Sequence, residues 1–567
     1  MDVGIVGSGP AVESLRAALA DVDATAVEVA PESLGSTPVG AVVAPAGSEV
    51  FDAADGRADR WVAVEIGGVG GHARDGLDAA VSVFADETAG YGDLRTRVAS
   101  TNTESEGRPS GNRSAVRFAG ALAGRRLVAL LSGEQVAGSV VEVAGASVGA
   151  ERRVLPVPRP ATRDRTVRRD FREVSLDDAI SRAERAVDDR VGLLTQVGER
   201  ESWPVPYYMA GTADTTSFSD ARAAEFAGGV DADWNPAFMK ALGEGLERYC
   251  AGVYRATEFT SAPESNRANP VPVRAFVRPD GYETPGREEP IPWVDGEDLI
   301  TGETASLPAE FVHYPPSAER FKPAITTGLG LGNSGAEALL SGLYEVIERD
   351  ATMLAWYSSF EPLGLDVDDD GYASLEKRAR AENLDATALL VTQDVDVPVV
   401  AAAVHRPDEW PQFAMGSGAD LDAAAAARSA LAEALQNWTE LRLMGPEAAA
   451  GEEGAIARYA DFPVEARRFV DADAAVPAAS VGPDEMPTGE AELEAVVDRA
   501  SDADLSPYAA RLTTADVERL GFEAVRVLAP EAQPLFTGEP FFGERARAVP
   551  RDLGFEPELE KAYHPFP

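Results

Sequence analysis

The chain of 567 residues contains a single cysteine, Cys250, so an internal disulfide and a cysteine-rich zinc site are both excluded. Its four histidines are scattered along the sequence and form no recognisable metal cluster: His72, His313, His405 and His564. A bound metal would therefore need oxygen ligands. Runs of about 18 apolar residues are absent, as is a basic N-terminal region, so we expect no membrane span, no secretory signal and a cytoplasmic location.

Lysine is also scarce: four of the 51 basic residues are lysines, while Asp and Glu together number 95. The resulting net charge is -44. This composition resembles that of proteins from salt-in halophiles, where a hydrated acidic surface keeps proteins soluble. We therefore attribute the charge to adaptation to the solvent. It argues against bulk electrostatic binding to nucleic acid, and we expect no nucleic-acid partner.

The length exceeds that of one ordinary core, so two or more domains are expected. Residues 1–150 begin with a strand, the turn Gly7-Ser8-Gly9, a helix and a second strand that ends at Glu28. This βαβ pattern predicts a small Rossmann-like domain. Val12 stands where a third glycine would belong, and we interpret the fingerprint as a tight first turn rather than as a dinucleotide site. Residues 151–170 are rich in Arg and Pro and are typical of a linker on an acidic surface.

Three later helical segments each carry two oxygen-bearing side chains three residues apart: Glu244 and Glu247, Glu345 and Glu348, and Glu433 and Gln436. Residues three apart lie on one face of a helix, about 5–6 Å apart at Cβ. On the first and third segments this face lies opposite the apolar stripe, so periodicity alone predicts a solvated face.

Two observations favour a different interpretation. The neighbours of the acids are small, such as Gly243, Ser341 and Ala432, which leaves room for a ligand. Asp350 falls on the apolar side of its helix, where a buried carboxylate needs a partner. If the three faces converge, their carboxylates repel one another unless cations lie between them, and oxygen-only ligands suit Mg²⁺. The glycine-rich loop at 326–338 leads into the second helix, whose N-terminus favours phosphate.

Five ordered motifs resemble the YcaO superfamily: ALGEGLERYCAG, GLGLGNSGAEALLSGLYEVIERDATMLAW, ALAEALQ, LTTADVERLGFEAVRVLAPEAQPL and the final YHPFP. The resemblance covers about residues 171–567. It implies a mixed α+β (α/β) fold with a large ATP-binding domain that has no P-loop. Residues 1–150 resemble the small ubiquitin-activating-enzyme-like, or docking, segment of fused cyclodehydratases.

The resemblance also implies that ATP and Mg²⁺ are the cofactors and that the acid pairs form one cradle for them. It implies five metal ligands: Glu244, Glu247, Glu345, Glu348 and Glu433. It implies five contacts to the nucleotide: Arg248, Asn333, Glu337, Arg349 and Gln436. The terminal prolines, Pro565 and Pro567, match the catalytic tail of azoline-forming members.

The implied reaction is ATP-dependent cyclodehydration of Cys, Ser or Thr to azolines on a ribosomally synthesised peptide, as in bacteriocin maturation. Alternatives are thioamidation with a sulfur-donating partner and a non-catalytic docking scaffold. An oxidoreductase built on Gly7 and Gly9 leaves most of the chain unexplained. The expected partners are the peptide substrate, a separate peptide-recognition or dehydrogenase protein, and a second copy of the chain in a homodimer.

The sequence departs from the family pattern at several positions. Val230 and Asp231 stand where many members carry Gly-Lys-Gly, and Ala241 replaces a common serine. The tail is shorter than the family's Pro-x-Pro-x-Pro ending. Residues 1–150 lack the cysteines of the structural zinc site that many relatives have. We therefore expect altered handling of the nucleotide.

Overall fold

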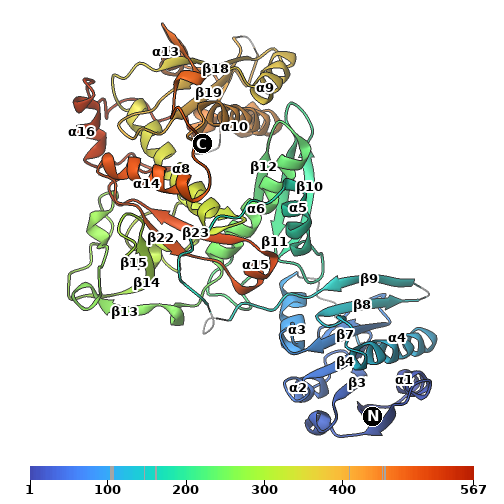
Figure 1. Ribbon diagram of the computed structural model, residues 1–567. Helices are drawn as coiled ribbons and strands as arrows, with labels where there is room; N and C mark the ends of the chain where they lie inside the picture. Colours follow the sequence, from blue (N-terminus) through green and yellow to red (C-terminus); the bar gives the residue numbers. More distant parts are fainter. Residues whose placement is uncertain are drawn as a thin grey trace. The chain divides into compact units, whose positions relative to one another are not determined.

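The computed structural model describes residues 1–101, 107–145, 147–159, 163–407, 409–449, 451 and 455–566. The chain divides into two compact units (Figure 1). The first unit comprises residues 1–159, 185–196 and 212–219, and the second comprises 160–184, 197–211 and 220–567. Within the described residues, no helix combines the length and the apolar character that a membrane crossing requires.

The first unit is built on a seven-stranded sheet in the order β2-β1-β3-β4-β7-β8-β9. Its strands are β1 (Asp2–Val6), β2 (Thr25–Glu28), β3 (Val39–Pro45), β4 (Arg60–Ile66), β7 (Ala79–Ala85), β8 (Ser139–Ala144) and β9 (Ser147–Arg153). Strands β2, β1, β3 and β4 run parallel, whereas β7, β8 and β9 are added antiparallel. A two-stranded ribbon pairs β5 (Gly68–Val69) with β6 (His72–Ala73).

Helices cover both faces of this sheet: α1 (Pro10–Ala20) and α4 (Arg113–Leu131) on one, α2 (Val50–Ala54) and α3 (Tyr91–Ser100) on the other. Gly7 has a positive φ of 116°, and a Cβ there would lie 2.2 Å from the carbonyl oxygen of Val43. The first turn is therefore tight because β3 passes directly beneath it. The prediction of a mixed α/β fold with a separate N-terminal α/β region is confirmed.

The second unit contains three sheets. The first is β10-β11-β12, the second is β13-β14-β22-β23-β16 with β15 beside β14, and the third is β20-β19-β18-β17-β21. The strands of the first two sheets are β10 (Leu194–Glu201), β11 (Tyr207–Thr212), β12 (Phe226–Val230), β13 (Thr260–Pro263), β14 (Pro290–Asp298), β15 (Thr304–Pro308), β16 (Leu329–Gly332), β22 (Tyr508–Arg511) and β23 (Glu523–Leu528). Those of the third are β17 (Leu363–Asp366), β18 (Asp385–Leu390), β19 (Val399–His405), β20 (Phe413–Ala419) and β21 (Ala475–Pro477).

Three long helices link these sheets: α6 (Trp234–Gly252), α8 (Gly335–Trp356) and α10 (Ala423–Met444). Helix α6 packs on β12 and also contacts β16, while α10 packs on β19 and β20. Helix α8 contacts β16 and β23 of the second sheet and β19 and β20 of the third, so it lies between the two (Figure 1). The remaining helices are α5 (Leu176–Ala183), α7 (Ala309–Val312), α9 (Asp370–Ala381), α11 (Pro446–Ala449), α12 (Ala455–Tyr459), α13 (Val464–Val470), α14 (Glu490–Asp502), α15 (Ala515–Leu520) and α16 (Arg545–Asp552).

The largest core cluster surrounds α8, and a second one joins α10 to the third sheet. Asp350 is buried in α8 and has the partner that its position demands. Arg545 Nη2 lies 2.7 Å from Asp350 Oδ2, and the backbone N–H of Gln533 donates to Oδ1 at 2.7 Å. The carboxylate thereby ties α8 to the start of α16 and to the segment around Gln533.

Candidate nucleotide and metal site

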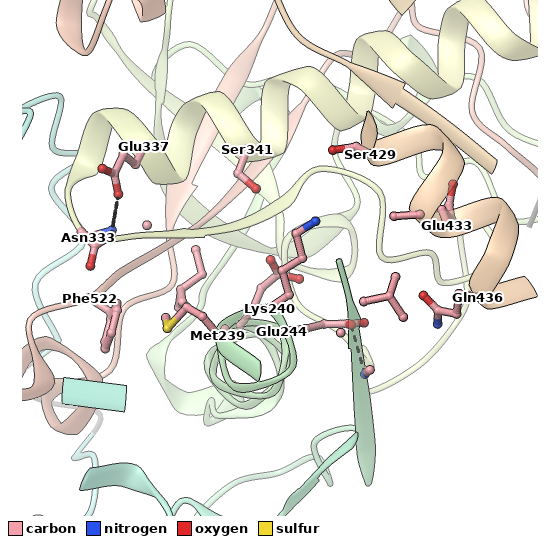
Figure 2. A pocket seen from close by; sticks show the side chains of 18 of the residues that line it. Met239, Lys240, Glu244, Asn333, Glu337, Ser341, Ser429, Glu433, Gln436 and Phe522 are labelled. Carbon is pink, nitrogen blue, oxygen red and sulfur yellow. Dashed lines mark hydrogen bonds between the residues drawn. The ribbon is translucent and has the colours of Figure 1, made fainter. Parts of the chain in front are cut away.

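A cavity of about 520 Å³ lies where α6, α8 and α10 approach one another (Figure 2). That volume is within the range of small-molecule and cofactor sites. Six of the ten candidate metal and nucleotide ligands line it: Glu244, Glu247, Asn333, Glu337, Glu433 and Gln436. The segments that carry them are up to about two hundred residues apart in sequence, and the helix packing brings their polar faces together.

Small residues keep this space open. Gly228 and Gly229 on β12, Gly243 on α6, Ser341 on α8 and Ser429 on α10 all line the cavity. A Cβ on Gly229 would lie 2.1 Å from the backbone nitrogen of Ala241, so β12 can approach α6 this closely only with glycine there. The space between the helices is therefore left open beside the side chains of the acids.

Glu345, Glu348, Arg248 and Arg349 are not among the residues that line this cavity but are connected to it through ion pairs. Arg248 lies 3.1 Å from Glu244 and 3.4 Å from Glu247. The guanidinium of Arg349 lies 3.6–4.0 Å from three carboxylates, those of Glu345, Glu348 and Glu433. The two arginines thus supply positive charge inside a cluster of like-charged acids.

Backbone and hydroxyl donors orient three of the acids. The Ser417 N–H donates to Glu433 Oε2 at 2.6 Å, and its hydroxyl donates to Glu348 Oε1 at 2.7 Å. The Gly328 N–H donates to Glu345 Oε2 at 3.0 Å. Ser417 also lines the cavity, so it connects the inner acids with the open space.

Burial dominates the electrostatics of these acids. It raises the pKa of Glu247 to about 8, with Arg248 opposing the rise and Glu244 and Glu345 adding to it. Burial likewise raises the pKa of Glu348 to about 7, and Arg349 opposes that rise. Glu433 shifts in the same direction for the same reason. In the absence of a cation Glu247 and Glu348 therefore hold protons close to neutral pH.

The donor set fits a divalent cation that a nucleotide helps to hold. Among the described residues, no three acids, histidines or cysteines are arranged as a complete metal site on their own. Mg²⁺ commonly takes one or two carboxylates from the protein and completes its octahedron with waters and substrate phosphates. Acids whose burial leaves them protonated are groups that a cation would deprotonate on binding.

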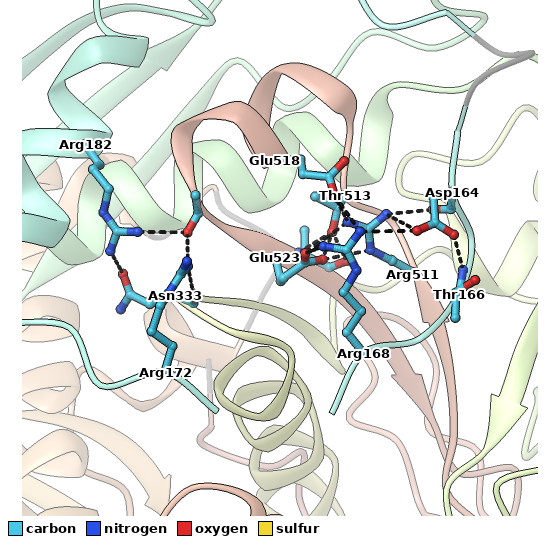
Figure 3. Close-up of polar contacts among 12 residues, drawn as sticks. Asp164, Thr166, Arg168, Arg172, Arg182, Asn333, Arg511, Thr513, Glu518 and Glu523 are labelled. Carbon is cyan, nitrogen blue, oxygen red and sulfur yellow. Dashed lines mark hydrogen bonds and ion pairs between the residues drawn. The ribbon is translucent and has the colours of Figure 1, made fainter. Parts of the chain in front are cut away.

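At one side of the cavity, the loop before α8 is held by arginines from residues 163–184 (Figure 3). Arg182 Nη2 donates to Asn333 Oδ1 at 2.7 Å, and Arg172 donates to the Asn333 carbonyl. Glu337 Oε2 accepts from the backbone N–H of Asn333 at 2.7 Å and from its side-chain amide at 3.0 Å. The orientation of the Asn333 amide is therefore fixed from both ends.

A second group of contacts holds the same N-terminal segment of this unit. Arg168 donates to Glu523 and Glu518 at 2.8 and 2.5 Å, and the buried Arg511 pairs with Glu523 at 2.8 Å (Figure 3). Asp164 lies 3.2 Å from Arg168. The Arg-rich stretch is thus anchored on acids beside the cavity wall.

Several residues of the cavity had not been singled out from the sequence. Lys240 extends from α6 into the cavity and lies 2.7 Å from Asp231 (Figure 2). Phe522 lines the opposite side and receives the guanidinium of Arg182 at 5.2 Å from its ring centroid. Only the rarity of lysine in the sequence could have drawn attention to Lys240.

Pro565 is not among the residues that line the cavity; it is buried within the C-terminal segment. The Nε2–H of the neighbouring His564 donates to the Phe536 carbonyl at 2.8 Å. Pro567 lies outside the described residues. The catalytic role of both prolines stays a prediction.

A family of known proteins matches the part of the chain that forms the cavity. The family described as YcaO cyclodehydratase, ATP- and Mg²⁺-binding, matches residues 228–533, which is more than half of the chain. An uncharacterized protein of Methanothermobacter thermautotrophicus is 29% identical over 219 residues, which are 37% of this chain and 56% of that protein. An uncharacterized protein in the tfuA 3'region of Rhizobium leguminosarum bv. trifolii is 28% identical over 268 residues, 44% of this chain and 61% of that protein. The chain thus spans less than two thirds of the length of either relative.

Three solved structures share the fold. A heterocyclase in complex with substrate and cofactor superimposes with a TM-score of 0.74 at 17% identity, over 98% of this chain and 83% of that one. The heterocyclase TruD gives 0.65 at 16% identity, over 98% and 81%. YcaO from Methanopyrus kandleri, bound with AMPPCP and Mg²⁺, gives 0.51 at 23% identity, over 65% and 94%. With the family match, the convergent acids and these folds, the chain belongs to the YcaO family, a family of enzymes whose cofactors are ATP and Mg²⁺.

Proposed function

We propose that this chain modifies peptide backbones at the expense of ATP, converting Cys, Ser or Thr residues of a ribosomally synthesised peptide to azolines. One observation carries the proposal: acids from three helices converge on a single cavity of about 520 Å³ beside an oriented asparagine amide. The family match supports the reaction class. The heterocyclase structures are less than 20% identical to this chain, so their similarity supports the fold and not the reaction.

Mg-ATP would be held by the residues that line the cavity and the pairs behind it. Glu244, Glu247 and Glu433 present carboxylates to the open space, and Glu345 and Glu348 stand behind them. Gln436 and Asn333 offer amides, which can donate to phosphate or ribose oxygens. Lys240 offers the one ammonium group in the cavity lining. We propose that it compensates for the lysine absent at Val230-Asp231.

When bound, ATP would supply the phosphoryl group that turns an amide oxygen into a leaving group. The side-chain O–H or S–H of the substrate forms the new bond to the preceding carbonyl carbon, and loss of phosphate leaves the C=N bond of the ring. No nucleophile from the protein is needed. This agrees with Cys250, which is buried in α6 and whose thiol pKa burial raises to about 12.

The C-terminal segment packs against the end of α8, where the indole N–H of Trp356 donates to the Ala562 carbonyl at 2.7 Å. Burial lowers the pKa of His564 to about 4, and the charge of Arg349 contributes to that shift. Arg349 in turn contacts Glu345, Glu348 and Glu433. A catalytic role for Pro565 and Pro567 rests on the resemblance of the tail to the family and is part of this proposal. A peptide-recognition or dehydrogenase partner, a homodimer and a cytoplasmic location are further proposals that stay predictions.

The test has two stages. Calorimetry first measures Mg-ATP binding to the parent and to Glu345→Gln, since this stage needs no substrate. Mass spectrometry then follows Cys-containing peptides incubated with the chain and Mg-ATP. Loss of one water per ring, dependent on ATP, supports azoline formation. Replacement of oxygen by sulfur in the presence of sulfide would assign the thioamide reaction instead, and absence of both binding and ATP hydrolysis would assign a non-catalytic scaffold.

A further inference from the structure

Lys322 is buried away from the nucleotide cavity and forms no ion pair with any residue that the structure describes. It is 9% exposed, and within the described part of the chain nothing accepts a hydrogen bond from its ammonium or pairs with it at 4.0 Å or less. The ring centroid of Phe311 lies 4.9 Å from Nζ, and the Glu310 carboxylate acts on the ammonium from beyond ion-pair distance. A buried ammonium without a partner is costly, and such groups often mark sites where a ligand supplies the missing charge.

Arg526 lies beside it and also has an unused donor. Its Nη1 and Nη2 donate to the carbonyls of Thr326 and Ile325 at 2.8 and 2.9 Å, which fixes the guanidinium plane. Its Nε is buried and makes no hydrogen bond to any described residue. Burial and then the charge of Arg526 lower the pKa of Lys322 to about 7, and Glu310 opposes the shift only in part. Burial also lowers the pKa of Arg526, to about 10, against the opposing charge of Glu345.

Both side chains line a small inner cavity of about 40 Å³, together with Arg349. At roughly 15 Å³ for each water, this space holds about three waters or one carboxylate-sized group. The residues described as lining it include three cations and no Asp or Glu. An anionic group is therefore the ligand that this cavity is built to accept.

A larger outer cavity of about 350 Å³ adjoins the inner one, and the two share Lys322, Ile325 and Pro534. Its walls are mainly apolar and include Tyr282, Phe536 and Phe541. Exposed residues at its rim include Asp280 and Glu539. These acids repel further negative charge, so a suitable ligand carries its negative charge at the inner end only.

We propose that the two cavities together bind the C-terminal residues of a peptide, with the terminal carboxylate against Lys322 and Arg526 and an apolar side chain in the outer cavity. Carboxylate capture at a chain end combined with an apolar pocket is a recurrent mode of peptide recognition. None of the residues that line these two cavities lines the nucleotide cavity, and the test runs without nucleotide, so a failure of peptide binding can be told apart from a failure of Mg-ATP binding.

The test uses the full chain without nucleotide and compares two probes, N-acetyl-Ala-Leu-Phe with a free carboxyl group and the same peptide with a C-terminal amide. Binding is measured by calorimetry at fixed salt. We expect the free acid to bind at least about tenfold more tightly than the amide. Lys322→Met keeps the length of the side chain, relieves the buried charge and should melt no lower than the parent. In this variant the preference for the acid should disappear.

Lys377→Met is the matched control, because Lys377 is exposed on α9 and should leave the preference unchanged. Equal binding of acid and amide by the parent would overturn the proposal, whatever Lys322→Met does. So would persistence of the preference in Lys322→Met, or no binding of either probe up to roughly 10 mM. If 3-phenylpropionate binds as tightly as the tripeptide, the site takes small carboxylic acids and the assignment to a peptide terminus is wrong.

Discussion

Replacing Glu247 with Gln should stabilise the chain in the absence of ligands and abolish its stabilisation by Mg-ATP. Glu247 lies in α6, with its side chain 14% exposed at the wall of the nucleotide cavity. Its charged partner is Arg248 at 3.4 Å. Glutamine keeps the size and polarity of the side chain while removing the ionisable group.

The magnitude follows from the pKa of Glu247, which burial raises to about 8 from an ordinary value of 4.5. Between these two values the unfolded chain holds the carboxylate ionised, whereas the folded chain holds it protonated. The folded state then binds more protons, so stability falls as the pH rises from about 4.5 to about 8. At pH 7 this penalty amounts to roughly 3 kcal/mol as an upper limit, at about 1.4 kcal/mol per pH unit.

The measurement is denaturant unfolding of the parent and Glu247→Gln in molar KCl from pH 4 to pH 8. The variant should gain most of the 3 kcal/mol or so near pH 7 and almost nothing near pH 4. Mg-ATP at a hundred times its Kd should stabilise the parent by about 2.7 kcal/mol and the variant hardly at all. Glu376→Gln on α9 is the control and should change neither quantity, since among the described residues Glu376 forms an ion pair with the exposed Arg380 alone.

Two results would refute this reasoning. The variant could be less stable than the parent at pH 7 without ligand, which would mean that the Glu247 carboxylate is stabilised by contacts rather than penalised by burial. Alternatively, Mg-ATP could stabilise the variant as it does the parent. The acid pair on α6 would then be a helix face with no role in binding the metal.

Arg349→Met should lower the stability of the ligand-free chain by about 3 kcal/mol, because it removes the cation that three partly buried acids share; unfolding in denaturant measures this. Arg182→Met should cost about 1 kcal/mol and weaken Mg-ATP binding through the freed Asn333 amide, which calorimetry would detect. Lys240→Met should weaken Mg-ATP binding by about tenfold with the fold unchanged, and Lys377→Met should not. Dilution from molar to about 0.1 M KCl should lower the melting temperature, because the net charge of -44 is then less screened; an unchanged melting temperature would contradict the halophilic assignment.

The mixed α/β fold and the acid-bearing helices could be predicted from the sequence because their signals are local. The stripe of α10, which comprises Leu431, Leu435 and Trp438, is fully buried, as its 3.6-residue period predicts. Periodicity alone was wrong about the other face. Glu433 and Gln436 line a cavity instead of facing bulk solvent, because α10 is covered on one side by the third sheet and approaches α6 and α8 on the other. The small residues beside the acids indicated this arrangement.

The contacts that hold Asn333 and the Arg-rich segment could not be predicted, because they join residues that are distant in sequence. Arg182 and Asn333 are 151 residues apart, and Arg168 and Glu523 are 355 apart. The sequence shows an Arg-rich stretch and many acids, but in a chain with 95 acidic residues each arginine has too many candidate partners. The cavity at Lys322 could not be predicted either, because it depends on the ammonium having no ion-pair partner among the residues that the structure describes.

The nucleotide cavity favours a cation and the inner cavity favours an anion, and Arg349 contacts the acids of the first and lines the second. It contacts the acids around Glu345 and also lines the inner cavity with Lys322 and Arg526. A cation among the acids would reduce their need for the Arg349 guanidinium, which would then become a better donor for an anion in the inner cavity. Conversely, an anion in the inner cavity would pair with Arg349 and leave the acids less neutralised, which favours a cation among them. Metal and peptide carboxylate should therefore bind cooperatively, and by reciprocity each should strengthen the other by the same factor. Calorimetry of N-acetyl-Ala-Leu-Phe with and without Mg-ATP would measure that factor, and a value of one would show that Arg349 does not couple the two sites.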